Sequence, residues 1–136
     1  MQSDHIHTFA AVVYQFFGGL DRRDHVSTSQ LMATGGTWQR QGTDLVGPAQ
    51  VLAALEKRDP RRQTAHLVNN LWVDGASATR ARLRYYMTAY ETTTAPDGTV
   101  SAPQMLGVRD CTDELVLEDG QWRIWWKKSY RLLPAE

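Results

Sequence analysis

The sequence predicts an α+β domain in which N-terminal helices pack against a curved antiparallel sheet. Two observations support this prediction. Residues before position 60 hold apolar side chains mainly at helical spacing, whereas residues 62–133 hold four long strand-like segments separated by turn residues. A chain that places helices before a run of strands folds with the helices on one face of a sheet. A long sheet twists, and a sheet curled around the first helix forms a cone with an internal pocket.

The first helix is predicted from six apolar residues that recur at steps of three and four and therefore share one face. They are Ile6, Phe9, Ala10, Val13, Phe17 and Leu20. Ser3 or Asp4 can cap its start. Gly18 and Gly19 weaken its last turn, because each glycine costs about 1 kcal/mol relative to alanine in a helix interior. The pair indicates either close packing against another element or the end of the helix.

A second short helix, a short strand and a third helix complete the first part of the chain. Asp24 is a suitable N-cap for the second helix, and residues 37–42 have the pattern of a strand. Gly47–Pro48 begins the third helix, where the missing N–H of proline is harmless, and Asp59–Pro60 ends it.

Four long strands are predicted in the remainder, over residues 62–74, 78–93, 103–119 and 121–133. The turn sequences Asp74–Gly75, Pro96–Asp97–Gly98 and Asp119–Gly120 separate them and favour antiparallel neighbours. The second strand alternates apolar residues on one face (Ala81, Leu83, Tyr85, Met87 and Ala89) with arginines on the other. Such alternation is typical of a half-buried strand. In the last strand, alternation places Trp122, Ile124 and Trp126 on one face.

Length and composition indicate one soluble domain covering residues 1–136. The chain has 15 basic and 15 acidic residues and a formal net charge of zero, which gives no field that would steer it to nucleic acid. No apolar run is long enough to span a bilayer, and the N-terminus lacks the features of a signal peptide. One cysteine, Cys111, excludes an intrachain disulfide. We therefore expect a cytoplasmic protein that binds neither nucleic acid nor membrane.

Asp21 and His66 are the candidate catalytic residues. Asp21 follows Phe17 by four positions and Tyr14 by seven, so the three share a face if the helix persists that far. The alternative is that Asp21 only caps the following turn. His66 lies on a strand whose alternate positions include Asn70, and beside Asp21 it would form a general acid–base dyad. The alternative for His66 is an ordinary core or edge residue.

Several stretches resemble the SnoaL-like branch of the nuclear transport factor 2-like superfamily. They are LDRRD (residues 20–24), TWQRQGTDLVG (37–47) with the helix after it, HLVNNLWVDGASATRARLRYY (66–86) and DELVLEDGQWRI (113–124). That branch contains polyketide cyclases, scytalone dehydratase-type enzymes and the β subunits of ring-hydroxylating dioxygenases. The resemblance implies a cone fold, often dimeric through the outer sheet face. It also implies that Asp21 and His66 match acid–base residues of the dehydratase-like members.

The chain departs from these relatives at informative positions. The dehydratase-like members have a tyrosine immediately before the aspartate, where this chain has Leu20, and a second pocket histidine on a later strand. No histidine follows His66 here. Steroid isomerase-like members need an acidic base on the short strand, where this chain has Trp38, Gln39 and Arg40.

These observations predict a small-molecule lyase or isomerase, dehydratase- or cyclase-like, acting on a hydrophobic, oxygenated, aromatic or polyketide-like substrate. His66 is the expected general base and Asp21 the residue that orients it. The expected substrate-contacting residues are Tyr14, Phe17, Trp38, Asn70, Tyr85 and Met87. No cofactor is expected, and no metal, because no metal-binding motif is present. The alternative is a non-catalytic protein of the same fold. It would either bind a small molecule or act as a structural subunit whose outer sheet face, with Tyr86 and Trp125, contacts a second copy or a partner.

Overall fold

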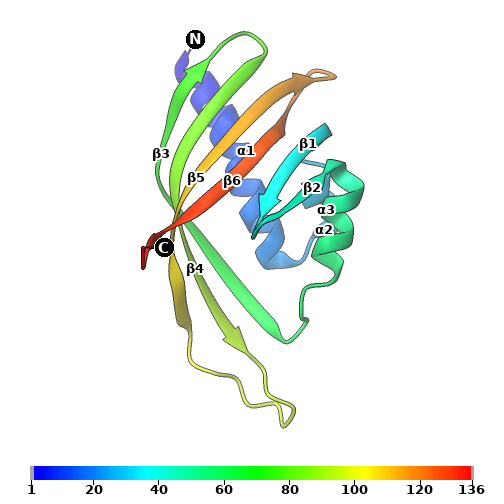
Figure 1. Ribbon diagram of the computed structural model, residues 1–136, viewed down its shortest axis with the longest axis vertical. Helices are drawn as coiled ribbons and strands as arrows, with labels where there is room; N and C mark the ends of the chain where they lie inside the picture. Colours follow the sequence, from blue (N-terminus) through cyan, green and yellow to red (C-terminus); the bar gives the residue numbers. More distant parts are fainter. Residues whose placement is uncertain (1, 136) are drawn as a thin grey trace.

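The computed structural model of the protein describes residues 2–135, with side chains from residue 5 onward, as three helices and one six-stranded sheet (Figure 1). The helices are α1 (Gln2–Arg22), α2 (His25–Ser29) and α3 (Gly47–Glu56). The strands are β1 (Met32–Arg40), β2 (Thr43–Val46), β3 (Arg62–Ala76), β4 (Arg80–Thr93), β5 (Gln104–Glu118) and β6 (Gln121–Leu133). The predicted α+β class is confirmed. Within the described residues, no helix is long and apolar enough to cross a membrane.

The sheet is mixed, which corrects the prediction of a purely antiparallel one. Its strand order is β2-β1-β6-β5-β4-β3, and every neighbouring pair is antiparallel except β1 with β6, which run parallel. The four long strands form the predicted antiparallel meander. The β1–β6 pairing joins two segments that are far apart in the sequence. Because no turn connects them directly, no turn sequence could have predicted this pairing.

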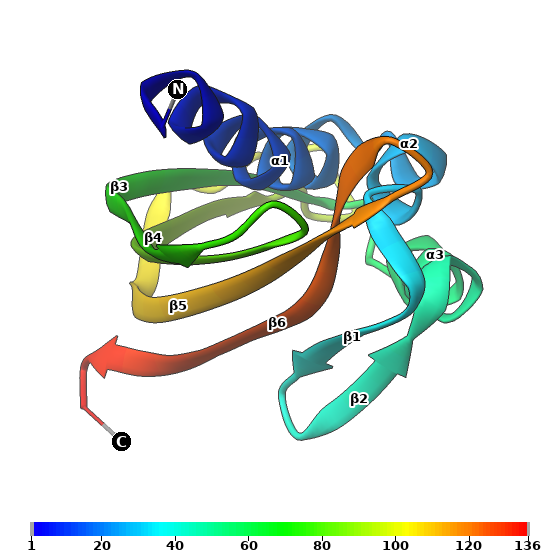
Figure 2. The same cartoon turned by 90° about the horizontal axis from the view of Figure 1, so that it is seen from above.

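The core lies between α1 and the concave face of the sheet, and Figure 2 shows α1 extending across that face. Residues spaced three and four apart on α1, including Phe9, Val13 and Phe16, are buried there. From β4, Leu83 and Tyr85 point to the same core, as the alternation predicted. Burying each such side chain contributes about 1.5–3 kcal/mol, so the sheet and α1 hold each other in place.

A β-bulge in β3 changes which residues face the core. The register with β4 shifts between Asn69 and Trp72, and Asn70 has a positive φ of 55°. Strict alternation from His66 would place Asn70 and Trp72 inward. The extra residue instead leaves Trp72 53% exposed and turns Leu71 toward the core.

A second bulge lies in β6. Glu114 of β5 pairs with Trp126, whereas the next residue, Leu115, pairs with Ile124, so Trp125 is the extra residue. Lys127 therefore takes the inward position that strict alternation gives to Trp126, and only 4% of it is exposed. The predicted common face of Trp122, Ile124 and Trp126 is wrong beyond Ile124 for this reason.

Candidate active site

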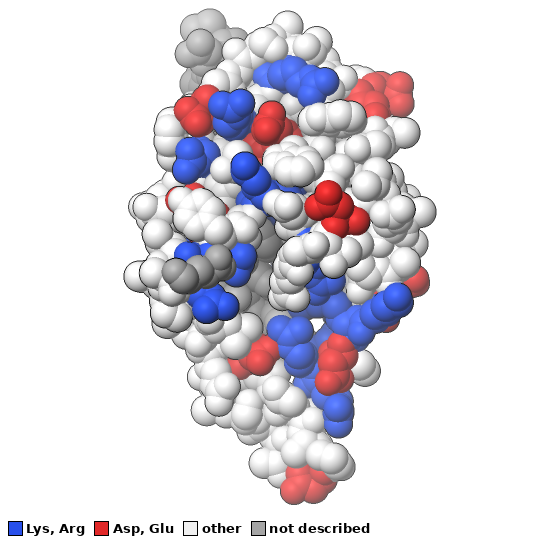
Figure 3. Space-filling model, in the orientation of Figure 1, with Lys and Arg blue, Asp and Glu red and all other residues white. Residues whose placement is uncertain are grey.

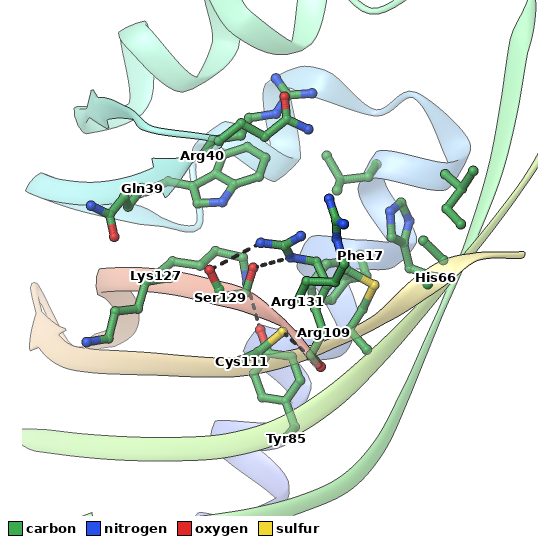
Figure 4. A pocket seen from close by; sticks show the side chains of 18 of the residues that line it. Phe17, Gln39, Arg40, His66, Tyr85, Arg109, Cys111, Lys127, Ser129 and Arg131 are labelled. Carbon is green, nitrogen blue, oxygen red and sulfur yellow. Dashed lines mark hydrogen bonds between the residues drawn. The ribbon is translucent and has the colours of Figure 1, made fainter. Parts of the chain in front are cut away.

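A cavity of about 490 Å³ opens between the C-terminal half of α1, the end of β1 and the concave face of the sheet. Figure 4 shows His66 and Phe17 at one end, Gln39 and Arg40 of β1 at the other, and side chains of β5 and β6 between them. Its apolar wall includes Phe17, Leu20, Trp38 and Met87. A volume of this size is typical of small-molecule sites.

The end of α1 is fixed by a Schellman motif. Arg23 adopts the left-handed conformation, with φ of 58°, and its N–H donates to the carbonyl of Leu20 at 3.2 Å. The N–H of Asp24 donates to the carbonyl of Gly19 at 2.9 Å. These are the two bonds of that helix-ending motif. Asp21 therefore belongs to the last helical turn, with a fixed direction for its side chain.

A side chain from the segment after α3 and another from the start of β3 satisfy the last carbonyls of α1. Arg58 donates to the Leu20 carbonyl at 2.9 Å, and Gln63 Nε2 donates to the Asp21 carbonyl at 2.9 Å. A carboxylate at a helix C-terminus faces the negative end of the macrodipole. The Arg58 guanidinium, bound to the same turn, offsets that cost and ties α1 to the start of β3.

The Asp21 carboxylate accepts three hydrogen bonds, all from β3. Thr64 Oγ1 donates to Oδ1 at 2.9 Å, and the backbone N–H of His66 donates to Oδ2 at 2.9 Å. The third partner is His66 Nδ1, 2.6 Å from Oδ1. The side chain that caps the next helix is that of Asp24, which accepts from the Ser27 N–H. Asp21 thus contacts the candidate histidine and does not cap the turn.

This geometry fixes the tautomer of His66. Because a carboxylate oxygen only accepts hydrogen bonds, Nδ1 carries the proton that faces Asp21. In the neutral ring, Nε2 then holds the lone pair. His66 lines the cavity, and no described residue hydrogen-bonds to Nε2. Burial lowers the pKa of His66, with smaller contributions from the charges of Arg58 and Lys127, while Asp21 acts in the opposite direction. The neutral imidazole, which can accept a proton, is therefore favoured near neutral pH.

The structure places four of the six predicted substrate-contacting residues on the cavity wall and two elsewhere. Phe17, Trp38, Tyr85 and Met87 line the cavity, and the Phe17 ring lies 5.3 Å from the His66 ring. Tyr14 is 52% exposed, because the buried face of α1 passes through Val13 and Phe17 and leaves Tyr14 on the other side. Asn70 lines a separate surface hollow because of the β3 bulge.

The sequence analysis did not predict a buried ionic cluster that lies at the cavity floor. Lys127 Nζ lies 3.0 Å from Asp113 Oδ2 and 2.9 Å from the Tyr85 hydroxyl, which donates to Asp113 Oδ1 at 2.9 Å. Nζ also lies 4.4 Å from the centres of the Phe16 and Phe17 rings. Asp113 is fully buried. No local pattern marks this cluster, because Lys127 faces inward only through the β6 bulge.

The cavity wall also carries a free thiol. Cys111 lines the cavity, but burial raises the pKa of its thiol to about 12, so it carries almost no thiolate at neutral pH. Across the part of the chain with described side chains, no three His, Cys, Asp or Glu residues gather as a group that could hold a metal ion.

Comparison with known proteins identifies the fold independently. The model of the SnoaL-like domain family matches residues 5–127. Among curated proteins, none matches the sequence. The protein Aln2 from a Streptomyces species is 21% identical, with 94% of this chain and 91% of that chain covered and a TM-score of 0.76.

Two further solved structures have the same fold. A putative scytalone dehydratase from Novosphingobium aromaticivorans is 17% identical over 96% of this chain and 85% of that chain, with a TM-score of 0.82. ActVI-ORFA from Streptomyces coelicolor is 18% identical over 93% of this chain and 96% of that chain, with a TM-score of 0.78. At these identities the likeness establishes the shared fold alone.

Proposed function

Since the chain belongs to the SnoaL-like domain family, we propose that it is a small-molecule lyase or isomerase of dehydratase or cyclase type. Its substrate is a hydrophobic, oxygenated molecule of aromatic or polyketide-like character. The main support for this proposal is the 2.6 Å contact between His66 Nδ1 and Asp21 Oδ1. This contact leaves Nε2 open to the cavity as a proton acceptor. His66 is the general base, and Asp21 is the residue that positions it.

In the proposed reaction, His66 Nε2 removes a proton from a carbon next to a substrate carbonyl. The resulting imidazolium is stabilised by the carboxylate of Asp21, which stays ionised. In a dehydration, Nε2–H then protonates a hydroxyl group β to the carbonyl. The carbon–oxygen bond breaks, a carbon–carbon double bond forms and water leaves. In an isomerisation, the same proton returns to a different carbon. One imidazole serves as base and then as acid, which suits a chain with no histidine after His66.

The cavity suits an aromatic substrate. Its volume of about 490 Å³ lies within the usual range for small-molecule sites. Trp38 packs edge-on against Phe16, with ring centres 5.0 Å apart, which fixes the indole on the part of the wall that β1 forms. A protein of the same fold from Catenulispora acidiphila was solved in complex with S-DNPA, which supports a small-molecule role for this site.

Proton exchange in heavy water tests the proposal. We expect the protein to catalyse exchange of the acidic C–H protons of a bicyclic aromatic ketone such as β-tetralone, followed by NMR. His66→Ala is expected to lower the rate by about 10²–10⁴, the usual contribution of a general base. Asp21→Asn keeps part of the rate, with its acidic limb moved to lower pH because the negative charge that favours the protonated ring is gone. His7→Ala is the matched control, because His7 is exposed and lies near the start of α1, three turns or more before Asp21.

Two results contradict this function. Unchanged exchange in His66→Ala removes the assigned base. Binding of the ketone without any exchange or dehydration supports the alternative, a non-catalytic small-molecule-binding protein of the same fold.

We also propose that the protein forms a homodimer through the outer face of the sheet. Trp72, Tyr86 and Tyr130 are 38–54% exposed and lie around Asp110, and an exposed group of large aromatic residues is typical of an interface. Trp125 is also 38% exposed. We place this dimer in the cytoplasm, in keeping with the free thiol of Cys111. Sedimentation that yields a monomer at all concentrations contradicts the dimer and leaves the assignment of His66 untouched.

A further inference from the structure

The wall of the cavity is strongly basic. Seven of its lining residues are cationic, and no acidic residue is among those that the structure places on the wall. They are Arg40, Arg58, Arg62, Arg109, Lys127, Lys128 and Arg131. The whole chain carries 15 basic and 15 acidic residues, so this is a local concentration of charge. Figure 3 shows Lys and Arg side chains gathered around the hollow in this face of the molecule.

Carboxylates of the protein neutralise only part of this charge. Arg62 pairs with Glu91, and Lys127 pairs with Asp113. Within the described part of the chain, no ion pair joins Arg40, Arg58 or Arg109 to a carboxylate. The cavity therefore keeps an excess of positive charge after its internal pairs are formed.

These three guanidinium groups are held in position by neutral partners. Arg58 donates to Thr64 Oγ1 at 3.1 Å as well as to the Leu20 carbonyl. Arg109 donates to the hydroxyl of Ser129 at 2.7 Å and to its carbonyl at 3.2 Å. Arg40 lies over the Trp38 ring, 5.2 Å from its centre. Groups fixed in this way lose little conformational entropy when they bind a ligand.

Arg40, Arg58 and Arg62 form one group, which we call the arginine cluster. All three line both the cavity and the adjoining hollow beside α3, so they lie at the border between the two. Burial, and then the charge of Arg62, lowers the pKa of both Arg40 and Arg58. Like charges in a partly buried site repel each other, and a bound anion relieves that repulsion.

We propose that the substrate carries an oxyanion group, a carboxylate or a phosphate, which the arginine cluster binds while the aromatic body lies against Phe17 and Trp38. A guanidinium presents paired N–H donors that match such a group bidentately. Arg58 also contacts Thr64, a hydrogen-bond partner of Asp21. Arg58 thus connects the anion site to the dyad, and the positive field of the cavity stabilises the enolate that forms when His66 removes a proton.

This inference rests on the proposed function, but it is tested by binding alone. Four naphthalene probes share one aromatic body: naphthoate, naphthyl phosphate, naphthylmethanol and naphthylmethylamine. We expect at least one of the two anions to bind about tenfold or more tightly than the alcohol, the usual effect of a hydrogen bond to a charged group, and the amine to bind most weakly. The preference falls with added salt. The tighter of the two anions identifies the oxyanion group.

Variants assign the preference to the cluster. Arg40→Gln removes an arginine that makes no hydrogen bond to another element in the described part of the chain, and it is expected to reduce anion binding about tenfold while leaving the alcohol unaffected. Arg58→Lys keeps the positive charge but loses the paired N–H donors of the guanidinium. It is expected to weaken anion binding less than Arg40→Gln does. Arg82→Gln, at an exposed position of β4, is the matched control.

The proposal is overturned if neither anion exceeds the alcohol, if no probe binds up to its solubility limit, or if Arg40→Gln leaves anion binding unchanged. Failure of the proposed function looks different. In that case wild type and His66→Ala both bind the anion selectively, yet neither exchanges substrate protons.

Discussion

Breaking the buried ion pair between Lys127 and Asp113 is expected to destabilise the fold severely. The two charges lie 3.0 Å apart, with Asp113 fully buried and Lys127 4% exposed. At an effective dielectric constant of 20, their attraction amounts to about 5.5 kcal/mol. Lys127→Met removes that attraction and leaves a buried carboxylate whose remaining donor is the Tyr85 hydroxyl. Such a change typically costs about 3–5 kcal/mol.

Thermal and denaturant unfolding measure this cost. For a chain of 136 residues, each kcal/mol shifts Tm by about 3.5 °C, so Lys127→Met is expected to lower Tm by roughly 10–17 °C. The double variant Lys127→Met with Asp113→Leu removes both charges and is expected to lose much less than the sum of the single changes. A loss below about 1 kcal/mol in Lys127→Met, or additive losses in the double variant, refutes a buried ion pair at the cavity floor.

Three further predictions concern α1, the cavity thiol and His66. Gly19→Ala places a Cβ 1.9 Å from Thr28 Oγ1 and is expected to cost about 1–3 kcal/mol; Gly18→Ala meets only the tip of Arg22 at 3.4 Å and is expected to stabilise by up to about 1 kcal/mol. Equal denaturation midpoints for the two variants contradict close packing at Gly19. Cys111, with a thiol pKa of about 12, is expected to resist iodoacetamide at pH 8 until the chain unfolds; rapid labelling of the native protein opposes this. Since the pKa of His66 is lower in the fold than its ordinary value of 6.5, the unfolded state binds more protons below pH 6.5, so stability falls as pH decreases through that window. His66→Gln is expected to reduce this slope, and an unchanged slope excludes His66 as its source.

Local sequence patterns predicted the elements that local interactions determine. The apolar spacing of α1, the Gly47–Pro48 start of α3 and the Asp–Gly turns each depend on residues a few positions apart. Asp24 caps α2 as expected. The close packing indicated by the Gly18–Gly19 pair occurs at Gly19, where the side chain of Thr28 in α2 leaves no space for a Cβ.

Long-range pairing and bulges account for what the sequence did not reveal. Parallel pairing of β1 with β6 leaves no mark in either strand. A single extra residue in a strand reverses the facing of every residue beyond it, which is why Asn70 and Trp126 were misplaced and Lys127 was missed. The structure does bring Asp21 and His66 together, 45 positions apart in sequence. The family resemblance suggested that these two residues lie close together, which local periodicity alone could not predict. Their catalytic roles are a proposal to be tested by experiment.

The proposed function depends on Asp21 holding His66 with its proton on Nδ1 and its lone pair on Nε2. Nitrogen NMR of labelled histidine across a pH titration tests this claim without any substrate. We expect His66 to be neutral at pH 7 with Nδ1 protonated, to titrate below 6.5, and to titrate at still lower pH in Asp21→Asn. A proton on Nε2, or a titration that Asp21→Asn leaves unchanged, contradicts it.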